Sequence, residues 1–147
     1  MDIDRGAPAI ADGEIEIAAP PATVWAVLSD LAAWPSWNRD VRSVSLEGPV
    51  EPGTVFRWKS GPASLVSTLQ VVDEPREIAW TGVTMRIHAV HVFRLSPSDG
   101  GTSVRSEESW RGLIPSVLKG YSRSTLRSGI EKVLAALKVE AERRARR

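Results

Sequence analysis

Two neighbouring stretches of alternating side chains, separated by a glycine-rich turn, constrain the fold of this chain more than any other feature. They run from Met85 to Leu95 and from Thr102 to Arg111, and Ser98-Asp99-Gly100-Gly101 lies between them. Successive side chains of a strand point to opposite faces, so a simple hairpin here places His91 directly across from Glu108. A titratable pair on an otherwise apolar face is typical of a pocket wall rather than of a packed core.

The alternation also predicts which side chains share that face. The first stretch contributes Met85, Ile87, Ala89, His91, Phe93 and Leu95, and the second contributes Val104, Ser106, Glu108 and Trp110. In the same register Phe93 lies across from Ser106. His88 and His91 are on opposite faces of the first stretch, so these two histidines cannot bind one metal ion together.

Upstream of the hairpin, the chain reads as a strand, two helical pieces and four further strands. We expect the first strand at residues 14–17, a helix opened by Pro20-Pro21, and a shorter helical piece at residues 31–37 that Pro35 interrupts. Residues 41–46, 54–59, 64–72 and 77–82 are strand-like and are separated by proline- and glycine-containing turns. Short strands joined by short turns predict an antiparallel meander.

From about Pro115 onward the sequence predicts one long helix with two unlike halves. Its C-terminal half carries an apolar stripe made of Ile130, Val133, Leu134, Leu137 and Ala141. Its N-terminal half offers small residues instead, namely Ser116, Gly120, Ser122, Ser124, Thr125, Ser128 and Gly129. Small residues permit either close packing of the helix on the sheet or a space between the two. The polar residues on the facing strands favour a cavity.

This order of elements resembles the START-like (SRPBCC) superfamily, also called the helix-grip or polyketide cyclase/dehydrase fold. The resemblance covers residues 13–142. The segments that carry it are Ile15–Trp25, Trp34-Pro35-Ser36-Trp37-Asn38, Ile78–Gly82, and Gly101–Val104 followed by Glu107-Glu108. It implies an α+β helix-grip fold, in which a curved antiparallel sheet of about seven strands, two short helices and a long C-terminal helix enclose a cavity. We expect residues 1–12 to form a weakly ordered segment and residues 143–147 a basic tail.

Members of this superfamily include lipid carriers, hormone- and quinone-binding proteins, aromatic polyketide cyclases and co-chaperone domains. The resemblance therefore implies a cavity for an apolar or aromatic small molecule, but it does not select one chemistry.

Composition narrows the remaining classes. There is no cysteine, so disulfides, thiolate catalysis and cysteine-based metal sites are excluded. The net charge is +1, yet four arginines crowd the last five residues and the rest of the chain is acidic overall, so we expect no nucleic-acid partner. The chain has no apolar run long enough for a membrane span, no secretion-type N-terminus and no phosphate-loop or dinucleotide motif. We expect a cytoplasmic protein without cofactor or metal.

The alternation of each strand predicts an aromatic lining with a few polar groups. The expected ligand-binding residues are Phe56, Trp58, Leu65, Ser67, Trp80, Met85, Ile87, His91, Phe93, Ser106, Glu108, Trp110, Ser122 and Leu126. Trp25 and Trp37 are expected to be structural, packing the short helices on the sheet. Flat indole rings suit a ring-containing ligand, and an indole N–H can bind one oxygen on it.

The sequence leaves three functions open. The first is binding of a hydrophobic, ring-containing small molecule of lipid or polyketide type. The second is a polyketide cyclase, aromatase or dehydratase in which His91 and Glu108 move protons at an enol or ketone. The third is a module with a filled core that binds a partner through its sheet edge or basic tail. In the first reading, His91 and Glu108 only orient ligand oxygens or satisfy each other's hydrogen-bonding capacity.

Overall fold

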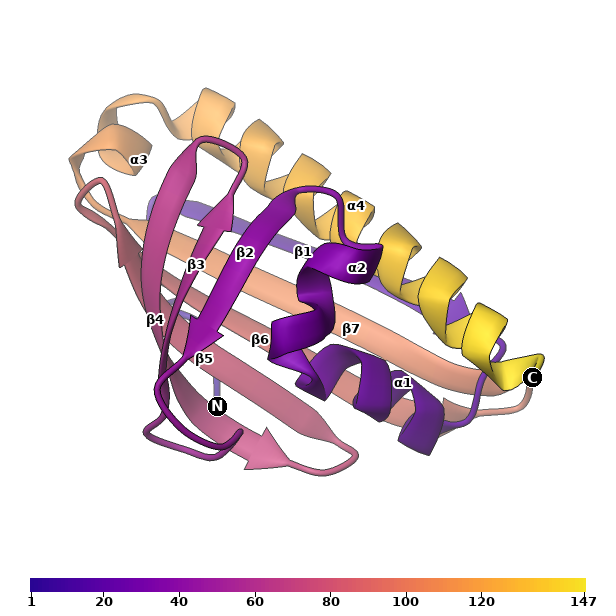
Figure 1. Cartoon of the computed structure of the whole chain (residues 1–147). Coiled ribbons are helices and arrows are strands. Elements are labelled where there is room, and N and C mark those ends of the chain that lie inside the picture. The colour runs from indigo at the N-terminus through magenta and orange to yellow at the C-terminus, as the bar shows by residue number, and fades with distance from the viewer.

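A long C-terminal helix lies across one face of a strongly curved antiparallel sheet, and two short helices close the lower end of the same face (Figure 1). The computed structural model describes all residues, 1–147. In chain order the elements are β1 (Ala9–Ile17), α1 (Pro21–Ser29), a 3-10 turn η1 (Leu31–Ala33), α2 (Trp34–Trp37), β2 (Val41–Leu46), β3 (Val55–Ser60), β4 (Ala63–Asp73), β5 (Glu77–Thr84), β6 (Ile87–Ser98), β7 (Gly101–Arg111), α3 (Leu113–Val117) and α4 (Lys119–Ala145).

The sheet has seven strands in the order β1-β7-β6-β5-β4-β3-β2, with every neighbouring pair antiparallel. The helix-grip architecture expected from the sequence is therefore confirmed. The β6–β7 hairpin also has the expected register, because His91 pairs with Glu108 and Phe93 with Ser106. The sheet's concave face, which these side chains share, faces the helices.

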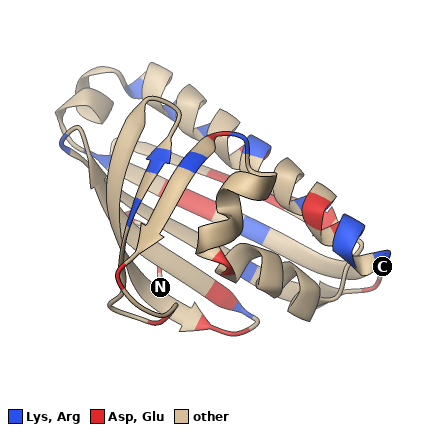
Figure 2. Cartoon of the chain, viewed as in Figure 1, with Lys and Arg blue, Asp and Glu red and all other residues tan.

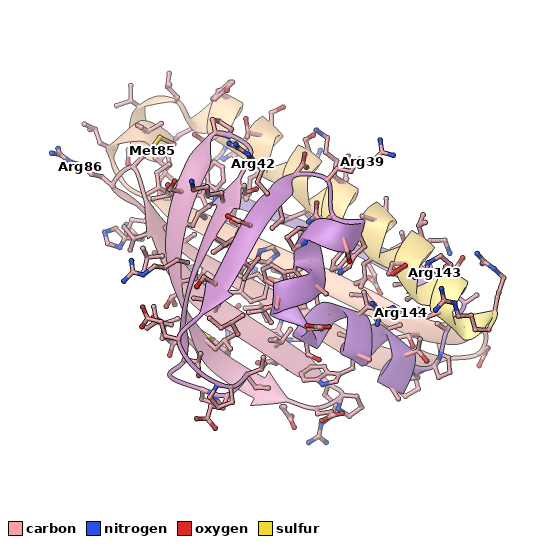
Figure 3. All side chains as sticks on the ribbon, viewed as in Figure 1. Arg39, Arg42, Met85, Arg86, Arg143 and Arg144 are labelled. Carbon is pink, nitrogen blue, oxygen red and sulfur yellow. The ribbon has the colours of Figure 1, made fainter.

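Two strand boundaries differ from the sequence prediction. Met85 was expected inside the strand, but Met85 and Arg86 form the turn between β5 and β6, and both have positive φ, 46° and 61°. Positive φ at both central residues is what a tight two-residue hairpin turn requires. Met85 is consequently 65% exposed, and Arg86 points away from the molecule at this tip (Figure 3).

The first strand is longer than expected. It begins at Ala9, inside the segment predicted to be weakly ordered, and pairs with β7 along its whole length. Alanine, aspartate and glycine are weak strand formers, so residues 9–13 gave no local signal. Backbone pairing with β7 and burial of Ala9 and Ala11 stabilise this part of the strand instead.

Residues that precede β1 cover the convex face of the sheet. Ile3 is buried there against Ala79 and Val92, whose side chains point away from the cavity side. Arg5 binds the buried Glu107 of β7, with 2.5 Å between Nη2 and Oε2. The opposite face of the strands that carry the polar pair is thus closed by apolar and ionic contacts.

Helix α4 packs closely on β1 through its C-terminal half. Ile130, Leu134, Leu137 and Ala141 are buried in the main core. Gly13 of β1 makes this approach possible, because a Cβ at this position would lie 2.9 Å from Ile130 Cγ2 and 3.1 Å from Leu134 Cδ1. The close-packing role expected for small residues therefore falls to a glycine on the strand. Of the small residues of α4, three line the cavity, namely Ser122, Thr125 and Gly129.

The basic tail expected from residue 143 begins inside α4, which continues to Ala145. Arg143 Nε donates to Glu140 Oε1 at 2.6 Å, and Arg144 contacts the same carboxylate. Figure 2 shows these basic and acidic positions side by side at the end of the helix. No helix of the chain is both long and apolar enough to span a bilayer.

Candidate functional site

A cavity of about 450 Å³ lies between the concave face of the sheet and helices α2, α3 and α4. Of the side chains predicted from the sequence to line it, the structure brings together Trp58, Leu65, Ser67, Trp80, Met85, Ile87, His91, Phe93, Glu108, Trp110, Ser122 and Leu126. The two exceptions are Phe56 and Ser106. Both point to the predicted face but are fully covered, Phe56 by neighbouring aromatic rings and Ser106 beneath His91.

The floor of the cavity is a row of small side chains across three strands. Ser67 of β4 pairs with Gly82 of β5, Gly82 pairs with Ala89 of β6, and Ala89 pairs with Trp110 of β7. We call Ser67, Gly82 and Ala89 the small-residue row. None of these three residues has a large side chain to fill the cavity. A Cβ on Gly82 would lie 2.5 Å from Ser67 Oγ, which shows how closely the row is packed.

Aromatic rings form the wall beside this row. Trp34 of α2 lies 5.5 Å from Trp58 and 5.2 Å from Trp80, measured between ring centroids. Trp80 continues to Phe93 in a stacked arrangement at 5.7 Å, and Phe93 stacks on His91 at 4.5 Å. Edge and offset contacts of this kind hold the rings in fixed orientations. The wall therefore exists before any ligand enters.

The indole N–H groups of the wall are mostly engaged within the protein. Trp34 Nε1 donates to the carbonyl of Leu28 at 2.9 Å, and Trp58 Nε1 donates to Ser67 Oγ at 3.0 Å. Trp37 also lines the cavity, in addition to packing α2, but its Nε1 is buried without a hydrogen-bond partner. Trp25, by contrast, is a core residue, which agrees with the structural role expected for it.

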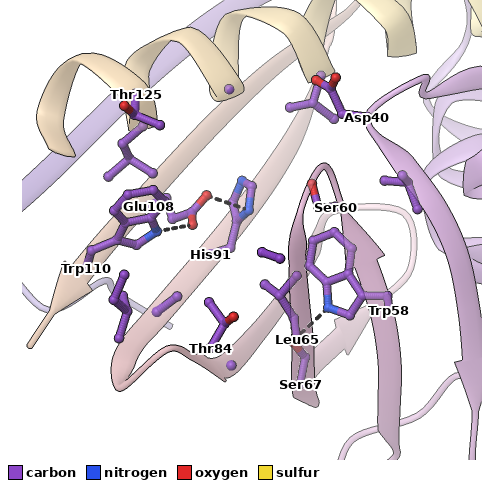
Figure 4. A pocket seen from close by; sticks show the side chains of 18 of the residues that line it. Asp40, Trp58, Ser60, Leu65, Ser67, Thr84, His91, Glu108, Trp110 and Thr125 are labelled. Atoms are coloured by element: carbon purple, nitrogen blue, oxygen red, sulfur yellow. Dashed lines mark hydrogen bonds and ion pairs between the residues drawn. The ribbon is translucent and has the colours of Figure 1, made fainter. Parts of the chain in front are cut away.

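The predicted polar pair forms the centre of a hydrogen-bonded cluster (Figure 4). His91 Nδ1 lies 3.0 Å from Glu108 Oε1, and His91 Nε2 lies 2.8 Å from Ser106 Oγ. Trp110 Nε1 donates to the second carboxylate oxygen of Glu108 at 2.7 Å. The side chains of His91 and Glu108 are 12% and 16% exposed, so both are largely removed from bulk water.

This geometry limits what the cluster can do chemically. A carboxylate only accepts, so in the neutral ring Nδ1–H donates to Glu108 and Nε2 accepts from the Ser106 hydroxyl. Both ring nitrogens of His91 are then occupied by protein groups. Glu108 has about four lone-pair sites, of which two are used, so it keeps capacity to accept further hydrogen bonds from the cavity. As it stands, the cluster is arranged to receive a donor rather than to remove a proton.

Several lining residues were not among the ligand-binding residues expected from the sequence. They are Leu28, Trp34, Trp37, Asn38, Asp40, Val41, Ser60, Pro62, Ala63, Gly82, Thr84, Ala89, Ile114, Tyr121, Thr125, Gly129 and Val133. For Gly82 and Ala89 the signal was present, because they are two residues from Trp80 and His91 on the same strands. Thr84 continues the same alternation on β5, and Val41, Ser60 and Ala63 are terminal residues of β2, β3 and β4. The remaining residues come from helices and turns, where strand alternation gives no information.

No three histidine, aspartate or glutamate side chains gather where they could hold a metal ion. The lining is mostly aromatic and aliphatic, and its hydroxyl groups come from Ser60, Ser67, Thr84, Tyr121, Ser122 and Thr125. Such a surface has the chemistry of a small-molecule site with a few convergent polar groups.

Comparison with known proteins agrees with this architecture. A search of curated sequences returns no match. The chain is similar to the hypothetical protein jhp0584 from Helicobacter pylori, with a TM-score of 0.82 and 14% identity, over 95% of this chain and 91% of that one. It is also similar to a START superfamily protein from Mycobacterium smegmatis, with a TM-score of 0.73 and 16% identity, over 91% of this chain and 97% of that one.

A third similar structure is the di-domain ARO/CYC StfQ from the steffimycin biosynthetic pathway, with a TM-score of 0.78 and 16% identity. The match covers 95% of this chain but 53% of that one, so this chain spans about half of the di-domain protein. Likenesses at such identities establish the fold alone. The sequence profile described as "Polyketide cyclase / dehydrase and lipid transport" matches residues 8–142, nearly the whole chain. With its START-like helix-grip fold, the chain belongs to the polyketide cyclase/dehydrase and lipid transport family.

Proposed function

We propose that this protein binds a hydrophobic, ring-containing small molecule in its internal cavity. The observation that carries the proposal is the pre-formed space of about 450 Å³, whose aromatic wall and polar cluster face the same volume. This volume falls within the range of known small-molecule sites, roughly 300–1,000 Å³. Family membership supports a hydrophobic-ligand or cyclase role in general terms.

In this proposal the rings of Trp34, Trp58 and Trp80 contact the flat body of the ligand. Glu108 accepts a hydrogen bond from a ligand hydroxyl or amine, and His91 and Trp110 hold its carboxylate in place. Their role is to orient Glu108, so the polar cluster determines direction of binding while apolar contact supplies most of the affinity.

The second candidate is a cyclase or dehydratase. The family description and the buried His91–Glu108 contact at 3.0 Å both favour it. However, a general base must reach the substrate proton, and Nε2 of His91 already contacts Ser106 at 2.8 Å. A substrate would have to displace that hydroxyl. If the protein is a cyclase, His91→Ala abolishes turnover of a poly-β-ketone substrate, whereas a pure binder has no rate to lose.

The third candidate, a partner-binding module, required a filled core. The cavity beside the small-residue row does not agree with that requirement. The other expectations of this reading, a partner at the sheet edge or at the C-terminal arginines, stay predictions, as does a cytoplasmic location.

The first test combines native mass spectrometry of the purified protein with tryptophan fluorescence titrations. The titrations use a naphthoquinone, a flavonoid and a long-chain fatty acid. Because Trp58, Trp80 and Trp110 line the cavity, we expect saturable quenching by at least one of the two ring compounds.

A matched pair of variants distinguishes the cavity from the surface. Ala89→Leu fills the floor of the cavity, and Val83→Leu places the same leucine side chain on the opposite face of the sheet, where Val83 is 45% exposed. We expect Ala89→Leu to weaken binding by at least about tenfold and Val83→Leu to leave it unchanged. Equal binding by both variants, each with an intact melting transition, would refute the proposal.

A further inference from the structure

The cavity lining contains acidic side chains but no lysine or arginine. Neither lysine nor arginine lines it, although the chain has 19 such residues, and its only acidic members are Asp40 and Glu108. Arg39 and Arg42, which flank Asp40 in sequence, are exposed and do not belong to the lining (Figure 3). Two carboxylates therefore face the cavity, and no lysine or arginine lines the cavity with them.

The two carboxylates occupy different parts of the site, as Figure 4 shows. Glu108 lies deep, with its side chain 16% exposed, and Asp40 is exposed to solvent. The partners of Glu108 are the imidazole of His91 and the indole of Trp110, neither of which carries a permanent positive charge. An anionic ligand group placed beside Glu108 would meet another negative charge in a region where water screens poorly.

The aromatic wall also favours positive over negative charge in the ligand. Ring faces carry a partial negative charge, so they attract cations and contribute nothing favourable to a bound anion. The ring of Trp80 contacts those of both Trp34 and His91, with centroid distances of 5.2 Å to Trp34 and 5.0 Å to His91. The carboxylate thus favours a neutral donor or an ammonium group beside it, and the rings add an attraction for the ammonium group.

We infer that the cavity selects ring-containing ligands that present a hydrogen-bond donor, a hydroxyl or a protonated amine, and excludes ligands with a carboxylate. Glu108 determines this selection, and Asp40 adds to it at the solvent side. The inference rests on the proposed function, since it names the chemistry of the ligand for the same site. It removes free fatty acids from the set of ligands and retains phenols and ring-containing amines.

Isothermal titration calorimetry at neutral pH tests this selection with three compounds that share one ring system. They are 2-naphthol, 2-naphthylmethylammonium and 2-naphthoate, which are neutral, cationic and anionic under these conditions. We expect 2-naphthol to bind at least about tenfold more tightly than 2-naphthoate, and the ammonium compound at least as tightly as 2-naphthol. Since the rings are the same, only the charge and the donor differ.

Two variants locate the origin of the selection. Glu108→Gln keeps the shape and the acceptor oxygen but removes the charge, so the preference for naphthol over naphthoate should shrink at least about threefold. Asp40→Asn makes the same change at an exposed position and should reduce the preference less. Its exposure also means that it tests the charge effect even if Glu108→Gln fails to fold.

Tighter or equal binding of 2-naphthoate to the unmodified protein would overturn the inference while leaving the proposed function intact. An unchanged preference in folded Glu108→Gln would overturn the role of Glu108. Failure of all three compounds, together with failure of the naphthoquinone and flavonoid titrations, would instead overturn the proposed function itself.

Discussion

Gly82 and Ser67 are in such close contact that one added methyl group should be measurable in the free energy of unfolding. A Cβ on Gly82 would lie 2.5 Å from Ser67 Oγ, well below any normal contact. The φ of Gly82 is not positive, so an alanine there is opposed by this contact and not by its own backbone. Gly82→Ala must turn the Ser67 hydroxyl away and break its 3.0 Å hydrogen bond from Trp58 Nε1. We expect a loss of about 1–3 kcal/mol, the usual range for overpacking.

The double variant isolates the cause. Ser67→Ala alone removes one hydrogen bond of Trp58 and should cost about 1 kcal/mol. In Gly82→Ala/Ser67→Ala the offending oxygen is gone, and the nearest remaining atoms, Ser67 Cβ and Val66 O, are each 3.5 Å from the new methyl group. These are ordinary contacts. The double variant should therefore be no less stable than Ser67→Ala, with a coupling of about 1–3 kcal/mol between the two sites.

Urea unfolding followed by circular dichroism measures all four proteins of this cycle. The four curves should have the same m-value, because the substitutions leave the surface exposed on unfolding unchanged. Strict additivity, with the double variant as unstable as the sum of the single ones, would refute the contact geometry. A Gly82→Ala protein as stable as the unmodified chain would refute it as well.

Three further predictions concern stability, and thermal or urea unfolding measures each. Trp34→Phe breaks a buried hydrogen bond, whereas Trp37→Phe removes a buried donor that has no partner, so the first should be more destabilising by about 1–3 kcal/mol, and equal losses would contradict this assignment. Gly13→Ala pushes α4 away from β1 and should lower the free energy of unfolding by about 1–3 kcal/mol. Gly129→Ala adds a methyl group in open space on α4 and should raise the free energy of unfolding by about 0.5–1 kcal/mol. A stabilising Gly13→Ala or a destabilising Gly129→Ala would be inconsistent with this packing. The pKa of Glu142 is lowered, chiefly by the hydrogen bond from the backbone N–H of Ala18 and then by the one from Lys138. The stability that ionised Glu142 contributes is therefore present above the ordinary glutamate pKa of 4.5 and is lost as the pH falls through the lowered pKa. Glu142→Gln should make the melting temperature depend less steeply on pH in this acid range, and an unchanged dependence would refute the contribution.

The part of the site that the sequence predicted best is the part made by one hairpin. Alternation with a period of two assigns every side chain of β6 and β7 to a face, and the short turn at Asp99-Gly100 sets the register. Together they are sufficient to predict that His91 lies across from Glu108. Local pattern suffices there because the two strands are adjacent in the chain.

Alternation assigns a face but not a depth, and this explains the residues that were misplaced. Phe56 is on the cavity face, yet Trp34, Trp58 and Trp80 surround its ring at 5.9, 6.1 and 6.0 Å. Ser106 is likewise on the correct face and lies beneath the imidazole it contacts. Coverage of this kind depends on side chains from other elements, so no single strand could reveal it.

Tertiary contacts also decided the remaining differences. Residues 9–12 form a strand because β7 offers them a partner, and Met85 leaves its strand because the tight turn to β6 requires positive φ. Trp34 joins the wall because the 3-10 turn η1 orients α2 over β3 and β5. Each of these outcomes depends on pairing or docking between segments rather than on local propensity.

The small-residue row has a consequence for how such a protein could diversify. The row crosses the sheet through Ser67, Gly82 and Ala89, whereas Trp80, His91 and Glu108 form the next row along the same strands. Room for the ligand and its required polarity are therefore encoded at separate positions. A larger residue in place of Gly82 or Ala89 would reduce the space in the cavity and leave Glu108 unchanged. Under the proposed function, relatives with this floor altered would differ in the size of their ligands before they differed in the chemistry they recognise.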